Sequence, residues 1–209
     1  NSNDENLKKI KDLINSDGID CEIIHHDKSE HKEKIAAENN QETLGNLSSL
    51  LKCFEIAKKD QSDLIYFVED DYLHYEHSLV DMLNTYERVS SQHKDEIIVC
   101  PSDYPFNYMN SEKTNILIGS QQHWRTITKM LCTFMISKKM FQKHIDNFEK
   151  TCEKRHEPFE KYLNKILESE IGISPIKSLA IHMTNVNSSY GLSPFIDIKK
   201  LWEENKIDQ

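Results

Sequence analysis

Several features that would assign this 209-residue chain to a class at once are scarce or missing. Glycine and proline occur only five times each, which excludes a long flexible linker or a low-complexity tail. No apolar run approaches the roughly 18 residues that span a bilayer, and no secretory signal opens the sequence. We therefore expect no transmembrane segment. The expected location is the cytoplasm, with the inner face of a membrane as the alternative.

Basic residues are also in short supply. Lys and Arg total 26 against 35 Asp and Glu, so the formal net charge is −9. Nucleic-acid binding needs a basic footprint, and we expect no nucleic-acid partner. The five cysteines (Cys21, Cys53, Cys100, Cys132 and Cys152) lie far apart without CxxC spacing. That spacing indicates free thiols in a reducing compartment rather than disulfides or a zinc site.

What the first hundred residues do contain is an alternation of helix and strand patterns. Apolar residues recur every three or four positions in the helical segments, and short apolar runs separate them. This alternation predicts an α/β fold with an open, mainly parallel sheet and helices on both faces. The run Asp63–Val68, apolar on both faces, is expected to be a central parallel strand. The expected helices are Glu5–Ile14, Thr43–Lys59 and Ser78–Val89, and the expected strands are Cys21–Ile24, Asp63–Val68 and Glu96–Cys100.

The second half is less regular and shows no internal repeat. A polar loop containing His123, Trp124 and Arg125 separates two short apolar runs. Pro158 suits the first turn of a helix, with Glu157 before it as the cap. The expected strands are Ile116–Gly119, Thr133–Ile136 and Ser178–His182, and the expected helices are Lys138–Glu149 and Pro158–Glu168.

Three carboxylates, Glu69, Asp70 and Asp71, directly follow the strongest predicted strand. Open α/β sheets bind ligands beyond the carboxyl ends of their strands. Adjacent carboxylates resist ionisation in a dry site, and a divalent cation relieves their repulsion. Oxygen ligands suit Mg²⁺ or Mn²⁺, and magnesium commonly combines one or two carboxylates with substrate phosphates. The alternative is a solvated acidic turn in which one aspartate caps a helix.

The EDD sequence resembles the DxD-type motif of nucleotide-sugar-dependent glycosyltransferases with the A-type, Rossmann-like fold. Within that fold the chain is most similar to the inverting family 2-like enzymes of bacteria and viruses. Asn1–Asp4 resembles the end of the family's DDxSxD segment, and Asn39-Asn40 with Gly45-Asn46 resembles the segment before the acidic motif. The segments GSQQHWR and CTFMIS resemble the acceptor side of a smaller subgroup. The resemblance implies one domain over residues 1–209, with a donor and metal half at 1–100 and an acceptor half at 101–209.

The resemblance implies a function as well as a fold. It implies transfer of a sugar, with inversion, from a nucleotide-sugar donor to a glycan or another hydroxyl acceptor, with Mn²⁺ or Mg²⁺ as cofactor, in glycan or polysaccharide synthesis. The family normally opens with a strand, a helix and a second strand that build the pocket for the nucleotide base. This chain starts where that second strand should end. Either the chain is a fragment, or the donor site is completed in another way.

The resemblance also assigns roles at the donor side. Asp71 is expected to be the direct metal ligand, and His182, at the end of the last predicted strand, the second ligand. Glu69 or Asp70 is expected to face the donor ribose or sugar, and Asp4 is expected to contact the donor. For His182 the alternative is a histidine whose hydrogen bonds are satisfied in the core.

An inverting transferase needs a general base that deprotonates the acceptor hydroxyl. The family usually supplies it as an acid at the start of a helix beyond the acceptor loop, and Glu157 fits that description. Glu153 and Glu160 are its rivals. The alternative for Glu157 is an ordinary first-turn carboxylate that the helix dipole favours.

Four further residues are candidates for substrate contacts. A tryptophan in a polar loop, Trp124, can stack on a sugar face, and Arg125 can neutralise a donor diphosphate. A buried tryptophan that anchors the loop is the alternative. Asp103 and Tyr104, after the strand that ends at Cys100, are expected to line the acceptor side.

Two other functional classes compete with a glycosyltransferase. One is a different metal-dependent phosphoryl or nucleotidyl enzyme. The chain lacks both the DxDx[TV] nucleophile motif of haloacid-dehalogenase-like phosphatases and the GxxxxGK[ST] loop of nucleoside triphosphatases. The other class is a non-catalytic binding domain with the same fold.

Overall fold

Two sheets organise the protein. The computed structural model describes residues 4–18, 20–37, 40–109, 111–187, 192–194 and 196–206. The large sheet has the strand order β1-β6-β3-β7-β5-β4, and a small sheet pairs β2 with β8. The strands are β1 (Leu64–Phe67), β2 (Tyr72–His74), β3 (Ile97–Val99), β4 (Ile116–Ile118), β5 (His123–Ile127), β6 (Phe134–Ser137), β7 (Ile171–Pro175) and β8 (Ala180–His182).

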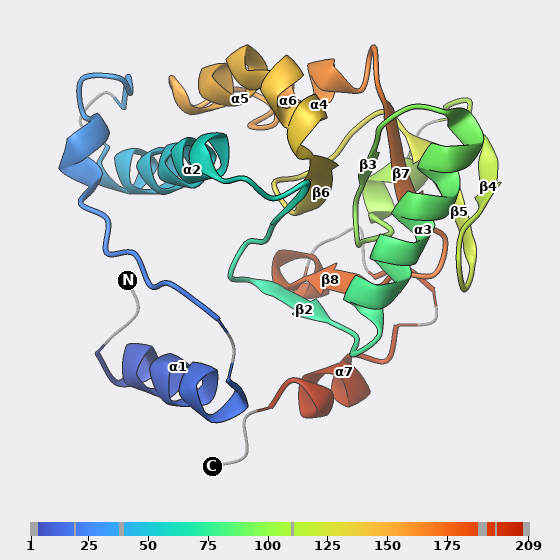
Figure 1. Ribbon diagram of the computed structural model, residues 1–209, viewed down its shortest axis with the longest axis horizontal. Helices are drawn as coiled ribbons and strands as arrows, with labels where there is room; N and C mark the ends of the chain where they lie inside the picture. The colour runs from blue at the N-terminus through green and yellow to red at the C-terminus, as the bar shows by residue number, and fades with distance from the viewer. Residues whose placement is uncertain are drawn as a thin grey trace.

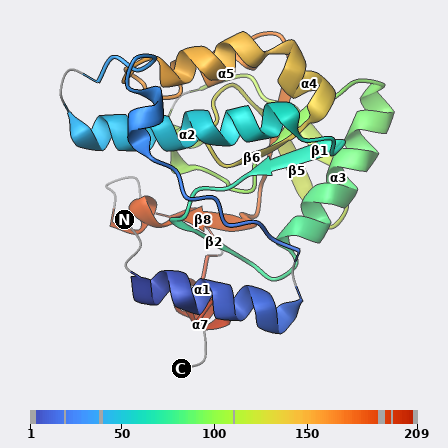
Figure 2. The same ribbon diagram turned by 60° about the vertical axis from the view of Figure 1, so that its left-hand side comes forward.

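Helices cover both faces of the large sheet (Figures 1 and 2). One face packs against α2, α5 and α6, and the opposite face packs against α3. On β3, Ile98 faces the α2 side, whereas its neighbours Ile97 and Val99 face the α3 side, as the two-residue period of a strand requires. The helices are α1 (Asp4–Asp17), α2 (Gln41–Lys59), α3 (Ser78–His93), α4 (Lys138–Lys143), α5 (Ile145–Cys152), α6 (Lys161–Ile166) and α7 (Ile198–Glu204), and the 3₁₀ turns are η1 (Lys28–His31), η2 (Pro105–Tyr108) and η3 (Met183–Asn187).

The helix α2 shows why the local predictions succeed. The side chain of Asn40 caps its first turn by accepting from the backbone N–H groups of Glu42 and Thr43, each at 3.0 Å. Its apolar positions Leu44, Leu47, Leu51, Phe54 and Ala57 are buried, and Phe54 packs edge-on against Phe67 of β1. The predicted helix Thr43–Lys59 is confirmed, as is the one at Ser78–Val89, which is α3.

The strand directions differ from the prediction. Four of the five pairings in the large sheet are antiparallel, and only β3 and β7 run parallel. The α/β class is therefore confirmed, but the mainly parallel sheet is wrong. Short apolar runs look alike in the two kinds of sheet, because the direction of a strand is decided by its pairing partner rather than by its own residues.

Two expected strand positions are also wrong. β1 is an edge strand of the large sheet rather than a central one, and three of its four residues are only half-buried. Cys21–Ile24 forms no strand, and both Cys21 and Ile24 are exposed. β1 and β3 both run antiparallel to β6, so they point the same way. Glu69, which follows β1, and Asp103, which follows β3, therefore lie beyond the same end of the strands.

The second half contains two strands that the prediction missed. His123–Ile127 is the strand β5 rather than a polar loop, and it pairs with the equally unexpected β7. The predicted helix Lys138–Glu149 is divided at His144 into α4 and α5. The predicted helix Pro158–Glu168 shortens to α6, whose N-cap is Glu160 rather than Glu157. Pairing between distant segments, which local periodicity does not report, creates the two unexpected strands.

Two absences expected from the sequence concern membranes and disulfides. Within the described ranges, no helix is long and apolar enough to cross a bilayer. All five cysteines are free: Cys21 and Cys53 are exposed, and Cys100, Cys132 and Cys152 are buried.

Candidate functional site

The candidate site forms where Asp71 meets His182. Asp71 lies in the turn between β1 and β2, and His182 ends β8. The antiparallel pairing of β2 with β8 sets Tyr72 opposite His182, and the backbone N–H of Met183 donates to the carbonyl of Asp71 at 2.8 Å. As a result His182 Nε2 lies 2.7 Å from Asp71 Oδ2. The structure thus brings together the two residues that the resemblance selects as metal ligands.

Thr184 completes the contacts around this pair. The Thr184 hydroxyl lies 3.3 Å from Asp71 Oδ2 and 3.2 Å from His182 Nε2. Adjacent ligands of an octahedral magnesium ion stand about 3 Å apart, close to the spacing of Asp71 and His182. Both side chains are partly exposed, at 42% for Asp71 and 18% for His182. Among the described residues no group of three or more His, Cys, Asp or Glu side chains is placed to hold a metal, so a cation here needs water or substrate oxygens as further ligands.

Glu69 is the half-buried carboxyl group of this cluster. Its backbone N–H donates to Thr133 Oγ1 at 3.0 Å, and the same hydroxyl donates to Glu69 Oε2 at 3.3 Å. Burial is the main cause that raises the pKa of Glu69 to about 7, and the negative charge of Asp71 adds to it. Glu160 and Asp70 raise this pKa further, whereas the Thr133 hydrogen bond lowers it. Glu69 therefore holds a proton up to near-neutral pH when no cation is bound.

Of the three candidate bases, Glu160 couples most closely to this cluster. It is half-buried, burial raises its pKa, and the charge of His182 opposes that rise. Its own charge raises the pKa of Glu69. Glu153 and Glu157 are exposed. Because α6 begins three residues later than predicted, Glu160 occupies the helix start that the sequence assigned to Glu157.

The proposed contacts of Arg125 and Asp103 with substrate are not supported, because the two residues bind each other. Arg125 is 8% exposed, and its guanidinium donates to Asp103 Oδ1 while lying 4.2 Å from the ring centroid of Tyr108. Asp103 is buried and also accepts from the Tyr108 hydroxyl at 2.5 Å and from Ser193 Oγ at 3.0 Å. The guanidinium of Arg125 is thus occupied by Asp103 and Tyr108 in this structure, and its donor-binding role stays a prediction.

Trp124 and Tyr104 are likewise internal. Both are fully buried, so neither side chain can reach an acceptor as the structure stands. Trp124 belongs to the core beneath α3, and a Cβ on Gly119 would come within 2.2 Å of its ring. Trp124 therefore matches the alternative, a buried anchor. Tyr104 instead contacts a neighbour of the site: its hydroxyl is hydrogen-bonded to that of Tyr72 at 2.7 Å.

Two of the expected donor-binding residues, Asp70 and Asp4, remain to be placed. Asp70 is exposed in the turn beside Asp71. The side chain of Asp4 lies outside the described part of the chain, so its donor-binding role stays a prediction. Sequence reasoning missed Tyr72, Thr133 and Thr184, which contact the cluster directly. Only Tyr72 carried a signal, because it follows the EDD motif without a gap.

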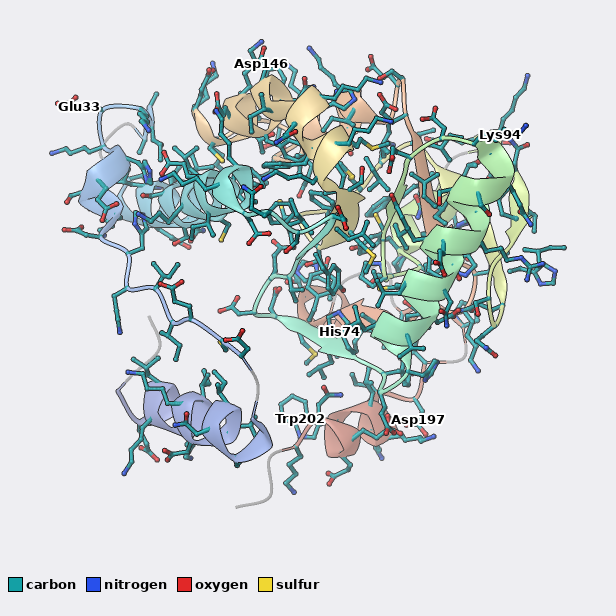
Figure 3. All side chains as sticks on the ribbon, in the orientation of Figure 1. Glu33, His74, Lys94, Asp146, Asp197 and Trp202 are labelled. Carbon is teal, nitrogen blue, oxygen red and sulfur yellow. The ribbon has the colours of Figure 1, made fainter. Side chains whose placement is uncertain are left out.

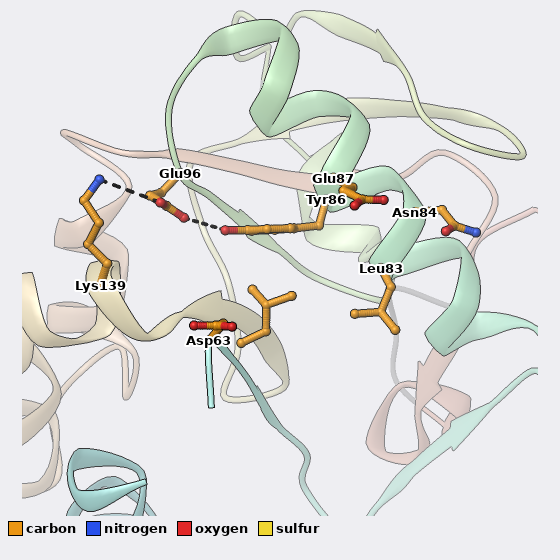
Figure 4. Close-up of a pocket in the computed structure, with 8 residues that line it drawn as sticks. Asp63, Leu83, Asn84, Tyr86, Glu87, Glu96 and Lys139 are labelled. Atoms are coloured by element: carbon orange, nitrogen blue, oxygen red, sulfur yellow. Dashed lines mark hydrogen bonds and ion pairs between the residues drawn. The ribbon is translucent and has the colours of Figure 1, made fainter. Parts of the chain in front are cut away.

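A cavity of about 500 Å³ lies elsewhere, between the start of β1 and α3 (Figure 4). Its lining includes Asp63, Leu83 and Tyr86, and the Tyr86 hydroxyl donates to Glu96 at 2.5 Å. Asp63 precedes the amino end of β1, whereas Glu69 and Asp71 follow its carboxyl end. The cavity and the acidic cluster are therefore at opposite ends of the strand.

The small sheet that carries the cluster is joined to the C-terminal helix. Figure 3 labels His74 on β2, with Asp197 and Trp202 on the segment that forms α7. The side-chain amide of Asn205 donates to the carbonyl of His74 at 2.9 Å. This contact fastens the end of α7 to the strand that follows Asp71.

Comparison with known proteins adds no assignment: no family model matches the chain, and neither a curated protein nor a solved structure does. The resemblance to glycosyltransferases therefore stays a prediction.

Glu69→Gln should remove part of the pH dependence of stability. The folded protein keeps the Glu69 proton up to about pH 7, whereas the ordinary pKa of a glutamate is 4.5. Between these values the folded state binds more protons than the unfolded state, so stability falls as pH rises. Allowing for partial exposure, we expect the wild type to lose about 1–3 kcal/mol relative to the variant. Urea unfolding of both proteins without metal at pH 5 and pH 8 measures this, and equal losses would contradict it.

Proposed function

We propose that this protein is a metal-dependent glycosyltransferase that moves a sugar from a nucleotide-sugar donor to a hydroxyl acceptor with inversion, in glycan or polysaccharide synthesis. The observation that carries the proposal is the 2.7 Å approach of His182 Nε2 to Asp71 Oδ2. Two ligand types from distant parts of the chain converge at the end of β1, beside a crowded and partly protonated Glu69. The EDD motif, which resembles the DxD-type motif of the family, supports the class of donor.

The roles follow from the contacts. Asp71 and His182 would hold Mn²⁺ or Mg²⁺, and the cation would stabilise the negative charge of the departing diphosphate. The Thr184 hydroxyl contacts both side chains and holds them next to each other. Glu69 would lose its proton with a cation bound, because the positive charge would oppose the burial and the repulsion from Asp71 that raise its pKa. Asp70, exposed in the same turn, faces the donor.

Proton acceptance is assigned to Glu160, with Glu157 as the alternative that the sequence favoured. A general base works best when its pKa lies near the operating pH. Burial raises the pKa of Glu160, whereas Glu157 is exposed. The two acids are close enough for the charge of Glu157 to raise the pKa of Glu160, so their variants form a matched pair.

Glu160→Gln should abolish most of the transfer without weakening donor binding. Glutamine keeps the shape of the side chain and loses only the ability to accept a proton, so the turnover number should fall by about 10²–10⁴-fold. Glu157→Gln, three residues away, should keep nearly full turnover. Calorimetry with nucleoside diphosphates in Mn²⁺ checks binding, and product formation from a panel of sugar nucleotides checks turnover. The reverse ranking of the two variants would return the role to Glu157.

The same measurements separate the competing classes. Binding of a nucleoside diphosphate that requires Mn²⁺, followed by donor-sugar turnover, supports the glycosyltransferase. Cation-dependent binding without turnover of any sugar nucleotide favours the non-catalytic domain, and release of phosphate or pyrophosphate favours a phosphoryl or nucleotidyl enzyme. Absence of cation-dependent nucleotide binding in the wild type would overturn the proposed function.

A further inference from the structure

Tyr72 contacts the candidate metal site although it is not one of the expected ligands. Tyr72 opens β2, directly after Asp71, and stands opposite His182 in the strand register. Its ring is stacked on the His182 imidazole, with the ring centroids 4.8 Å apart and the planes 14° from parallel. The ring of Tyr72 thus covers one face of the imidazole whose Nε2 meets Asp71.

Tyr72 is itself held in place. It is 8% exposed, and its hydroxyl is hydrogen-bonded to that of the fully buried Tyr104 at 2.7 Å. Tyr104 is in turn stacked on Phe106, with centroids 5.1 Å apart and planes within 9°. Because Tyr72 is held by Tyr104, and Tyr104 by Phe106, the Tyr72 ring has a defined position against His182.

His182 needs such a surface. Strand pairing fixes its backbone and Cβ, but the second side-chain torsion of a histidine is broad and has no strong staggered preference. The plane of the imidazole, and hence the direction of Nε2, must be set by what packs against the ring. Thr184 contacts the Nε2 atom, and the Tyr72 ring lies against the face of the imidazole.

We propose that Tyr72 is the positioning residue of this site and that its ring holds the His182 imidazole in the plane that aims Nε2 at Asp71. The consequence for cation affinity rests on the proposed function, whereas the positioning itself does not. Residues that orient a metal-ligating histidine typically change metal affinity by about 10–100-fold when they are replaced. The aromatic ring of Tyr72, rather than its hydroxyl, is the part that orients the histidine.

Three variants test this proposal. Tyr72→Leu removes the stacked ring, and Tyr72→Phe keeps the ring and loses only the hydroxyl. Tyr66→Phe is the matched control, because the Tyr66 hydroxyl bonds to Nε2 of a different histidine, His74, at 2.6 Å. Should Tyr72→Leu fail to fold, Tyr72→Val replaces it, since a β-branched residue suits a strand.

The first readout needs no metal. In protein with ¹⁵N-labelled histidine rings, His182→Gln identifies the His182 Nε2 resonance, whose chemical shift depends on the contact of Nε2 with Asp71 Oδ2. We expect Tyr72→Leu to move that resonance, Tyr72→Phe to keep it, and Tyr66→Phe to move only the His74 resonance. A His182 resonance that stays in place in Tyr72→Leu would overturn the proposal.

The second readout is Mn²⁺ affinity, followed by electron paramagnetic resonance. Tyr72→Leu should weaken binding by about tenfold or more, with wild-type affinity kept in Tyr72→Phe and Tyr66→Phe. Equal affinity in Tyr72→Leu and wild type would remove Tyr72 from the metal site. If the wild type binds no Mn²⁺, the proposed function fails while the resonance experiment still decides whether Tyr72 orients His182.

Discussion

Asp71→Ala should abolish Mn²⁺-dependent binding of a nucleoside diphosphate and leave the thermal melt nearly unchanged. The variant removes the carboxylate that pairs with His182, so a cation loses one of its two protein ligands. Folding should suffer little, because Asp71 is 42% exposed and a partly exposed ion pair contributes about 0–1 kcal/mol. Its removal also relieves the repulsion that raises the pKa of Glu69.

Glu76→Ala provides the control for this experiment. Glu76 is an exposed carboxylate just after β2, so the variant changes the net charge by the same amount without touching the Asp71–His182 pair. Calorimetric titration of wild type and both variants, with Mn²⁺ and with a chelator, measures the effect. Equal affinity of Asp71→Ala and wild type for the nucleotide in Mn²⁺ would contradict the assignment of Asp71 as a ligand.

Arg125→Met should destabilise the fold by about 3–5 kcal/mol, because it leaves the buried carboxylate of Asp103 without its cation. Burial already raises the pKa of Asp103, and Arg125 opposes that rise. Without Arg125 this pKa climbs further, so the loss of stability should be greater at pH 8 than at pH 5. Urea unfolding at both values tests the magnitude and the sign.

Two comparisons make the Arg125 experiment specific. Lys139→Met removes the cation of an exposed pair, in which Nζ lies 3.7 Å from Glu96 and the lysine is 81% exposed (Figure 4). That variant should cost less than about 1 kcal/mol. The double variant Asp103→Asn with Arg125→Met should be more stable than Arg125→Met alone, because the unpaired charge is gone. A loss as small as that of Lys139→Met would show that the buried pair contributes no more than a surface pair.

The buried pair also shows where sequence reasoning stopped. Trp124 and Arg125 are polar-loop residues by their neighbours, and a surface role in substrate binding follows naturally from that setting. In the fold their segment is the strand β5 between β7 and β4, which buries both side chains. Nothing within HWR reports this, since the strand forms by pairing with β7, about fifty positions later in the chain, and Trp124 packs in the core beneath α3.

The acidic motif shows the opposite case. Three carboxylates directly after an apolar strand were recognisable without any tertiary information, because the strand and the turn depend on adjacent residues. The assignment of Asp71 and His182 as metal ligands relied on resemblance and stays a prediction, whereas the antiparallel register of β2 and β8 is what brings the two side chains together. The assignment of the base shifted from Glu157 to Glu160 because the boundary of a short helix is decided by its packing.

The sequence by itself determined the helices α2 and α3, the strands β1 and β3, and the position of the acidic cluster. These features depend on periodicity and on neighbours within one or two helical turns, so the local free energy of each segment is enough to specify them. Only the tertiary structure decided the direction of β1, the burial of Trp124, the pairing of Arg125 with Asp103 and the stacking of Tyr72 on His182. Those features depend on which distant strands pair, and a pairing gains its free energy from both partners at once.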